Sequence, residues 1–175
     1  MNSVGIRLLK DAISEEEESN LLLQIYNQEW LDIYMRRVQH YGYKYEYRTR
    51  GLQRMYKEDD SLRGIPSWLV PKCVQDEMAP EQIIVNEYKD GQGISSHRDA
   101  LCFGPKILSL SLGADTVMTF TGGISSLDVK LPRRSLLILE GSVRYKLEHQ
   151  IKKHTGSTRV SITYRTLAEG ITTSK

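Results

Sequence analysis

The 175-residue sequence contains only two cysteines, no long hydrophobic run and little excess charge. Cys73 and Cys102 have no paired-ligand spacing, so we expect reduced thiols rather than a zinc finger or a disulfide scaffold. No apolar stretch approaches the roughly 20 residues that a membrane-spanning helix needs, and the N-terminal segment lacks the apolar core of a signal peptide. We therefore expect an intracellular protein of the cytoplasm or nucleus without a membrane partner. We also expect a monomer. The net charge of +2 is too small to indicate a nucleic-acid partner by itself.

Internal repeats and low-complexity segments are also absent, which argues against a solenoid or a disordered tail. The length fits a single domain, 1–175, with an N-terminal part, 1–81, and a core, 82–168. After Pro80, short alternating or apolar runs are separated by Gly, Pro, Asp and Ser, which is typical of an all-β sandwich or barrel. These runs cover 83–88, 107–112, 116–121, 127–131, 135–139 and 159–165. With the segments around His97 and His149 they give about eight strands, the number in a jelly roll.

Two helices are expected before this sheet. Residues 11–27 begin with a capping box, in which Ser14 caps the helix and Glu17 follows three residues later. The acidic run there suits the positive end of the helix dipole, and we interpret it as a solvated helix start without a function. Residues 67–78 should form a short second helix that packs on the core through Trp68, Leu69 and Val74. The predicted fold class is mainly β with N-terminal helices (α+β), a double-stranded β-helix or cupin-like jelly roll.

Residues 36–54 combine six Lys or Arg with a single acid. Tyr41, Tyr43, Tyr45 and Tyr47 alternate, so in one strand they would share a face suited to stacking on bases, with the cations pairing to phosphates. The other interpretation is a tyrosine-rich strand packed on the core with solvated charges outside. His40 is expected to be a polar residue of this surface rather than a metal ligand. The candidate substrate contacts are Arg36, Arg37, Gln39, Tyr41, Tyr43, Tyr45 and Arg48, and neutralising Arg36, Arg37, Arg48 and Arg50 together should weaken nucleic-acid binding.

The stretch 86–99, NEYKDGQGISSHRD, holds the first candidate metal ligands. His97 and Asp99 are two positions apart, so in an extended strand they project to the same side and can bind one metal ion. The same period places Asn86 and Tyr88 on one face of the preceding strand, and the glycines that follow allow a tight turn. An HxD pair alone is weak evidence, because short patterns of common residues recur by chance.

Two later segments of the chain add further residues to the candidate site that His97 and Asp99 begin. His149 supplies a possible third ligand, and the closing strand RVSITYR places Arg159, Ser161, Thr163 and Arg165 on one face. On a solvent-exposed edge such a face is ordinary, but inside a jelly roll two buried cations need anionic partners, and a small dicarboxylate would satisfy them. Two histidines and a carboxylate leave metal positions open, as in non-heme Fe(II) oxygenases. A zinc hydrolase could use the same ligands but would not need the arginine face.

These motifs occur in an order that resembles the AlkB family of Fe(II)- and 2-oxoglutarate-dependent dioxygenases. The resemblance covers about half the chain, 86–165, and includes ILSLSLG and LPRRSLLILEGSVRY. Upstream, RRVQHYGYKY is similar to the nucleotide-recognition lid of the branch that hydroxylates tRNA wobble uridine, so we call residues 36–54 the lid segment. This chain has no room for the RNA-recognition and methyltransferase domains of animal members, and the link between His149 and Arg159 is short.

The resemblance implies that His97, Asp99 and His149 are the iron ligands. Arg159 would then bind the distal carboxylate of 2-oxoglutarate, and Arg165 would lie near the end that chelates iron and help position the substrate. Further cosubstrate contacts would be Asn86, Tyr88 and Ser161. The cofactors implied are Fe(II), 2-oxoglutarate and O2.

The function implied is oxidative demethylation or hydroxylation of modified bases in DNA, RNA or tRNA, with the base single-stranded or flipped out of a duplex. A protein hydroxylase or lysine demethylase would use the same iron chemistry on a peptide. A non-enzymatic jelly-roll binding module and a zinc hydrolase are further alternatives. His154 is expected to be exposed and uninvolved, and Arg133 and Arg134 to form a solvated edge.

Overall fold

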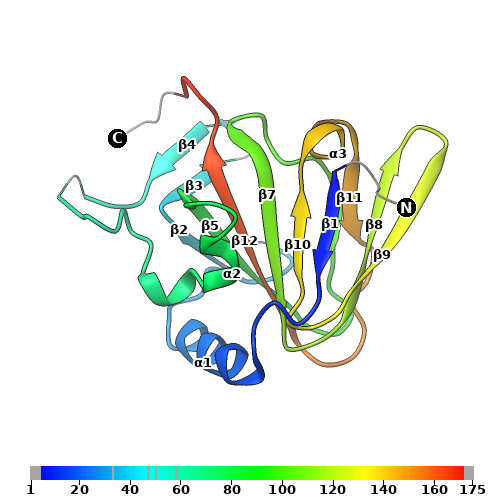
Figure 1. Ribbon diagram of the computed structural model, residues 1–175, viewed down its shortest axis with the longest axis horizontal. Coiled ribbons are helices and arrows are strands. Elements are labelled where there is room, and N and C mark those ends of the chain that lie inside the picture. The colour runs from blue at the N-terminus through cyan, green and yellow to red at the C-terminus, as the bar shows by residue number, and fades with distance from the viewer. Residues whose placement is uncertain (1–4, 33, 47, 50, 58, 172–175) are drawn as a thin grey trace.

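Two antiparallel sheets pack face to face, and helices cover the outer side of the larger one (Figure 1). The computed structural model describes residues 5–32, 34–46, 48–49, 51–57 and 59–171. The larger sheet runs β1 (Ile6–Leu9), β10 (Leu136–Leu139), β7 (Phe103–Leu112), β12 (Arg159–Leu167), β5 (Gln82–Tyr88) and β2 (Val38–Tyr41). The smaller sheet runs β6 (Ile94–His97), β11 (Glu148–Ile151), β8 (Thr116–Gly122) and β9 (Ser125–Leu131).

This arrangement confirms the predicted jelly roll. Every strand expected after Pro80 is present, and β1, which the sequence pattern did not reveal, adds an edge to the larger sheet. The outer face of that sheet packs against the helices, whereas its inner face and the smaller sheet enclose a second core around Met118, Phe120 and Leu137. Because strand residues alternate between faces, Val160, Ile162 and Tyr164 enter the outer core and the polar residues of β12 face inward.

The first helix begins as the capping box predicts. In α1 (Glu15–Tyr26), the Ser14 side chain accepts from the Glu17 amide and the Glu17 carboxylate accepts from the Ser14 amide. Leu21 and Ile25 are buried. No helix within the described ranges is long and apolar enough to cross a membrane.

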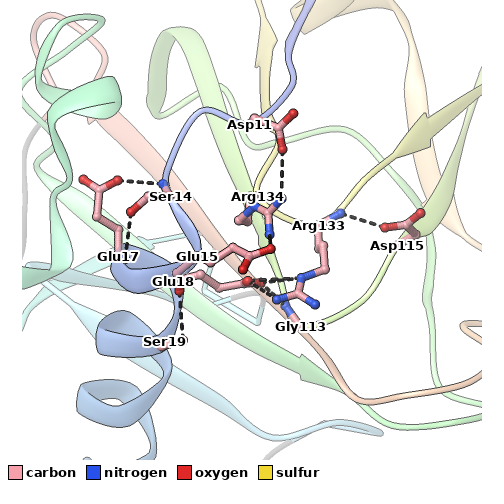
Figure 2. A network of polar contacts seen from close by, with 10 residues as sticks. All are labelled: Asp11, Ser14, Glu15, Glu17, Glu18, Ser19, Gly113, Asp115, Arg133 and Arg134. Carbon is pink, nitrogen blue, oxygen red and sulfur yellow. Dashed lines mark hydrogen bonds and ion pairs between the residues drawn. The ribbon is translucent and has the colours of Figure 1, made fainter.

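The acidic run is not wholly solvated, which corrects our expectation (Figure 2). Glu18 is only 1% exposed, accepts from the Gly113 amide at 2.8 Å and pairs with Arg133. Arg134 binds Asp11 and Glu15 at 3.0 and 2.9 Å, so the two arginines do not form a free edge. These ion pairs fasten α1 to the turns of the larger sheet.

The predicted helix at 67–78 is divided in two. A 3-10 turn, η1 (Ser67–Leu69), precedes α2 (Lys72–Gln75), and Pro71 between them caps α2. Val70 adopts φ −117° and ψ 84°, the non-helical conformation that a following proline favours. Leu69 and Val74 are fully buried against the outer core, as expected. The last helix, α3 (Gly141–Lys146), leads into β11.

The lid segment bends at Gly42 instead of forming one strand. Gly42 has φ +75°, and a Cβ there would lie 2.1 Å from the Glu81 carbonyl oxygen, so only glycine fits. Upstream of the bend, β2 joins the larger sheet, and downstream β3 (Tyr43–Glu46) and β4 (Gly51–Arg54) form a separate hairpin. Tyr41 therefore does not share a face with Tyr43 and Tyr45, contrary to our expectation. Tyr47 and Arg50 lie outside the described residues.

Candidate active site

A cavity of about 330 Å³ lies between the two sheets. Its floor is the inner face of the larger sheet, where every second residue of two neighbouring strands points inward. These residues are Gln82, Ile84, Asn86 and Tyr88 of β5, with Arg159, Ser161, Thr163 and Arg165 of β12. The register sets Arg159 beside Tyr88 at one end and Arg165 beside Gln82 at the other, so the cavity has an arginine at each end.

The three predicted metal ligands meet at the Arg165 end. His97 and His149 face each other across β6 and β11, with ring centres 4.4 Å apart. Asp99 follows the end of β6 rather than lying in the strand, and its Oδ2 is 3.6 Å from Nε2 of His149. Nδ1 of His97 is held by the Ser95 carbonyl oxygen at 2.8 Å, which leaves Nε2 for a ligand role. The sequence spacing thus brings the three side chains to one place.

Burial and charge set the protonation of two of these groups. Burial lowers the pKa of His149 to about 4, although the Asp99 carboxylate opposes the shift. Burial alone would raise the pKa of Asp99, but the Arg165 guanidinium and the neighbouring imidazoles hold it below its usual range. At neutral pH the His149 ring is uncharged and Asp99 is ionised, which are the forms that bind metal ions.

The Asp99 carboxylate divides its two oxygens between different neighbours. Oδ1 pairs with Arg165, whose other terminal nitrogen donates to Gln82 at 2.9 Å, while Oδ2 is the oxygen nearest His149. Within the described part of the chain, no three His, Cys, Asp or Glu side chains already stand in a complete metal-binding geometry. The donor set of two imidazoles and one carboxylate oxygen nevertheless suits a divalent transition metal, since Oδ2 remains available.

At the opposite end of the cavity, Arg159 is a buried cation without an anionic partner among the described residues. It is 1% exposed, and among the described residues its one hydrogen bond donates from Nη2 to Ser111 at 2.9 Å. Nε and Nη1 are buried and have no hydrogen-bond partner among the described residues. Burial lowers the pKa of this guanidinium, and the Tyr88 ring lies 5.3 Å away. An unpaired buried charge is costly, so an anion bound at this end would satisfy the Arg159 guanidinium.

Three candidate contacts in and just before β2 lie on the outer face of the larger sheet. Gln39 donates to the Ile25 carbonyl oxygen at 2.9 Å, and the Tyr41 hydroxyl donates to Gln39. Both therefore project into the outer core, away from the cavity, because the antiparallel register sets them beside outward-facing residues of β5. Arg37 also lies on that face, where it pairs with Glu87 at 2.7 Å. We remove these three residues from the candidate substrate contacts.

Arg36 and Tyr45 of the lid segment do line the cavity. Nε of Arg36 donates to Oδ1 of Asn86 at 2.9 Å, which places this arginine at the Arg159 end. The Tyr45 ring packs on Phe103 with the centres 5.8 Å apart. Tyr43 is instead buried in the inner core with its hydroxyl on that of Tyr56, and Arg48 is exposed.

Two further histidines lie outside the predicted ligand cluster. His40 lines the cavity, and both of its ring nitrogens are buried without a hydrogen-bond partner in the described ranges. Burial, with Lys44 and Arg165 nearby, lowers its pKa to about 4. The alternation of β2 would have identified it, since His40 lies between two outward residues. His154 was expected to be exposed, yet it is 1% exposed and its Nε2 lies 2.6 Å from the Ser157 carbonyl oxygen, so its role is structural.

A second cavity of about 610 Å³ adjoins the first near the metal-ligand cluster. The two share Arg98 and Tyr45, and the second is also lined by Leu101 and Tyr145. Leu101 is 76% and Tyr145 42% exposed, so this wall offers apolar and aromatic surface to an incoming molecule. The second cavity therefore opens toward the metal-ligand cluster from one side of the fold.

Known proteins are similar to this chain in sequence and in fold. A family profile described as the 2OG-Fe(II) oxygenase superfamily matches residues 5–165. The chain is 36% identical over 162 residues to tRNA (carboxymethyluridine(34)-5-O)-methyltransferase alkbh8 of Xenopus tropicalis, covering 84% of this chain and 25% of that protein. An uncharacterised protein of Acanthamoeba polyphaga mimivirus is 33% identical, with 94% of this chain and 85% of that protein covered. The solved structure of OsALKBH1 matches with a TM-score of 0.71 at 16% identity, covering 93% of this chain and 96% of that one.

Proposed function

Since the chain belongs to the AlkB family of the 2OG-Fe(II) oxygenase superfamily, we propose that it oxidises modified bases in nucleic acid, with His97, Asp99 and His149 as its iron ligands. The enzyme is an Fe(II)- and 2-oxoglutarate-dependent dioxygenase that uses O2. The observation that carries the ligand assignment is one cavity with a His-His-Asp cluster at one end and an unpaired, buried arginine at the other. A zinc hydrolase or a simple binding module has no need for this combination.

The residues of the cavity would hold the cosubstrate between the two ends. Arg159 would pair with the distal carboxylate of 2-oxoglutarate, helped by Ser161, Asn86 and Tyr88, which lie beside it in the register. Bound iron would supply the oxidation, in which decarboxylation of 2-oxoglutarate to succinate by O2 is coupled to hydroxylation of a substrate carbon. A hydroxylated N-methyl group leaves as formaldehyde, whereas a hydroxyl on a carbon-linked substituent stays.

Arg165 would keep the Asp99 carboxylate ionised and oriented. Its ion pair with Oδ1 leaves Oδ2 for the metal. The sequence placed Arg165 near the end that chelates iron, as a residue that helps to position the substrate, and the ion pair with Asp99 adds this second task. The second cavity beside it is where we place the entering nucleotide, with Tyr145 in its wall for stacking and Arg98 for a phosphate.

Nucleic acid is the substrate that the relatives and the lid segment favour. The names of similar proteins refer to tRNA modification in Xenopus and to a probable RNA/DNA demethylase in Danio rerio. The chain spans only a quarter of the Xenopus protein, so the particular base is not transferred from it. We place the enzyme in the cytoplasm or nucleus and propose that a monomer suffices, because one chain supplies every group of the site. In this scheme residues 1–81 contribute the lid segment and 82–168 the catalytic core.

The test is turnover on a panel of N-methylated DNA, N-methylated RNA and modified tRNA, with Fe(II) and 2-oxoglutarate. We expect succinate release with at least one nucleic acid, and formaldehyde where the modification is N-methyl. His97→Ala and His149→Ala should each abolish turnover. Peptides bearing methyl-lysine are tested as substrates in the same assay. Turnover of these peptides without turnover of any nucleic acid would contradict the proposed substrate class. Substantial turnover in both histidine variants would contradict the ligand assignment.

A further inference from the structure

Arg36 connects the lid segment to the Arg159 end of the cavity. Its Nε donates to Oδ1 of Asn86 at 2.9 Å, and its guanidinium carbon lies 5.6 and 5.5 Å from the ring centres of Tyr34 and Tyr88. The Tyr88 ring also contacts Arg159. Arg36, which precedes β2 in the lid segment, therefore contacts both Asn86 and Tyr88, the two residues that we assign to binding of the cosubstrate.

The hydrogen bond from Arg36 determines how the Asn86 amide is turned. A guanidinium can only donate, so the amide oxygen must face Arg36 and the amino group must face elsewhere. Asn86 is 5% exposed and lines the cavity, and its amino group donates to no acceptor within the described residues. Asn86 lies directly beside Ser161, one inward position from Arg159. The amino group is therefore a free donor beside the buried cation.

We propose that Arg36 is a positioning residue for 2-oxoglutarate, which holds the Asn86 oxygen so that the Asn86 amino group donates to a cosubstrate carboxylate alongside Arg159. Without Arg36 the amide is free to rotate and to turn its oxygen toward the carboxylate, which repels it. The inference rests on the proposed function, since it requires 2-oxoglutarate in this cavity. It also links the lid segment to the cosubstrate: a nucleic acid that moves Arg36 changes cosubstrate affinity, and the coupling is reciprocal.

The neighbouring arginine provides a matched control. Arg37 carries the same charge and lies on the opposite face, where it pairs with Glu87 and stacks on Trp30 with its guanidinium carbon 4.7 Å from the ring centre. Replacing either arginine by Met removes one charge from the same part of the chain. Of the two arginines only Arg36 lines the cavity, so we expect the replacement of Arg36, and not that of Arg37, to change cosubstrate binding.

The experiment measures binding of 2-oxoglutarate to Mn(II)-loaded protein without oxygen, by calorimetry and by the rise in melting temperature. We expect Arg36→Met to weaken binding about tenfold, as loss of an oriented hydrogen bond to a charged group does. Arg36→Lys retains a donor and should recover part of the affinity, and Arg37→Met should bind like the wild type. The melting temperature without ligand shows that each variant is folded.

A double-mutant cycle separates positioning from a general structural role. If Arg36 acts through Asn86, Arg36→Met should add nothing in an Asn86→Ala background. Wild-type affinity in Arg36→Met, or fully additive losses in the double variant, would overturn the inference while leaving the proposed function intact. A wild-type protein that binds no 2-oxoglutarate would overturn both, and is recognised before any variant is compared.

Discussion

Asp99 and Arg165 form an ion pair inside the cavity, although 66 residues separate them in the sequence. Asp99 follows β6 and Arg165 lies in β12, so the pair joins the smaller sheet to the larger one. The side chains are 4% and 13% exposed. A pair so little exposed to solvent contributes to both stability and ligand orientation.

Replacing Arg165 should destabilise the metal-free protein. Arg165→Met leaves the buried Asp99 carboxylate without its cation, and we expect the free energy of unfolding in urea to fall by about 3 kcal/mol. Arg63→Met removes an arginine from the exposed pair with Glu81 and should cost less than about 1 kcal/mol. Equal effects of the two substitutions would show that burial does not strengthen the Asp99 pair.

Replacing Arg159 should have the opposite effect on stability. Arg159→Met removes a buried cation that lacks an anionic partner, so without 2-oxoglutarate we expect unfolding to cost about 1–3 kcal/mol more. The same variant should lose the rise in melting temperature that 2-oxoglutarate gives to the Mn(II)-loaded wild type. A variant that is strongly destabilised yet still binds 2-oxoglutarate would contradict the assignment of this end of the cavity.

His40 should make the metal-free protein sensitive to mild acid. The pKa in the folded protein is lowered to about 4 from an ordinary 6.5, so as pH falls below 6.5 the unfolded chain takes up the proton first. Stability conferred by the neutral ring is therefore complete above pH 6.5 and is lost between pH 6.5 and 4. Between pH 7 and 5 the loss should be about 1–2 kcal/mol.

The check is urea unfolding of wild type and His40→Phe across this pH range. The difference in unfolding free energy between the two proteins should change by that amount from pH 7 to 5, with the variant relatively more stable at the acidic end. His154→Phe serves as a comparison, because that buried ring is hydrogen-bonded instead. A constant difference between wild type and His40→Phe would contradict a lowered pKa of His40.

The nucleic-acid surface is expected to depend on exposed cations rather than on all those in the lid segment. Arg36 and Arg37 are engaged within the protein, so we select Arg48 and Arg98, which are exposed. Replacing both with Gln should weaken RNA binding and reduce the slope of log affinity against log salt by about 1.4, the value for two phosphate contacts with a single strand.

Lys10 and Lys72 provide a control of equal charge, since both are exposed and lie outside the cavity lining. Their replacement by Gln should leave the salt slope unchanged, as measured by fluorescence anisotropy of labelled RNA. Equal losses in the two double variants would indicate a response to net charge alone.

The sequence by itself determined the jelly roll, the residues that share the polar face of β12 and the order of the ligand motifs, because strand alternation and capping are local properties of the chain. Only the tertiary structure decided which side of β2 faces the cavity: its register with β5 turns Gln39 and Tyr41 outward and His40 inward. The burial of Glu18, the bend at Gly42 and the joining of Asp99 to Arg165 depend on partners remote in sequence. Such contacts follow from packing, which local pattern does not encode.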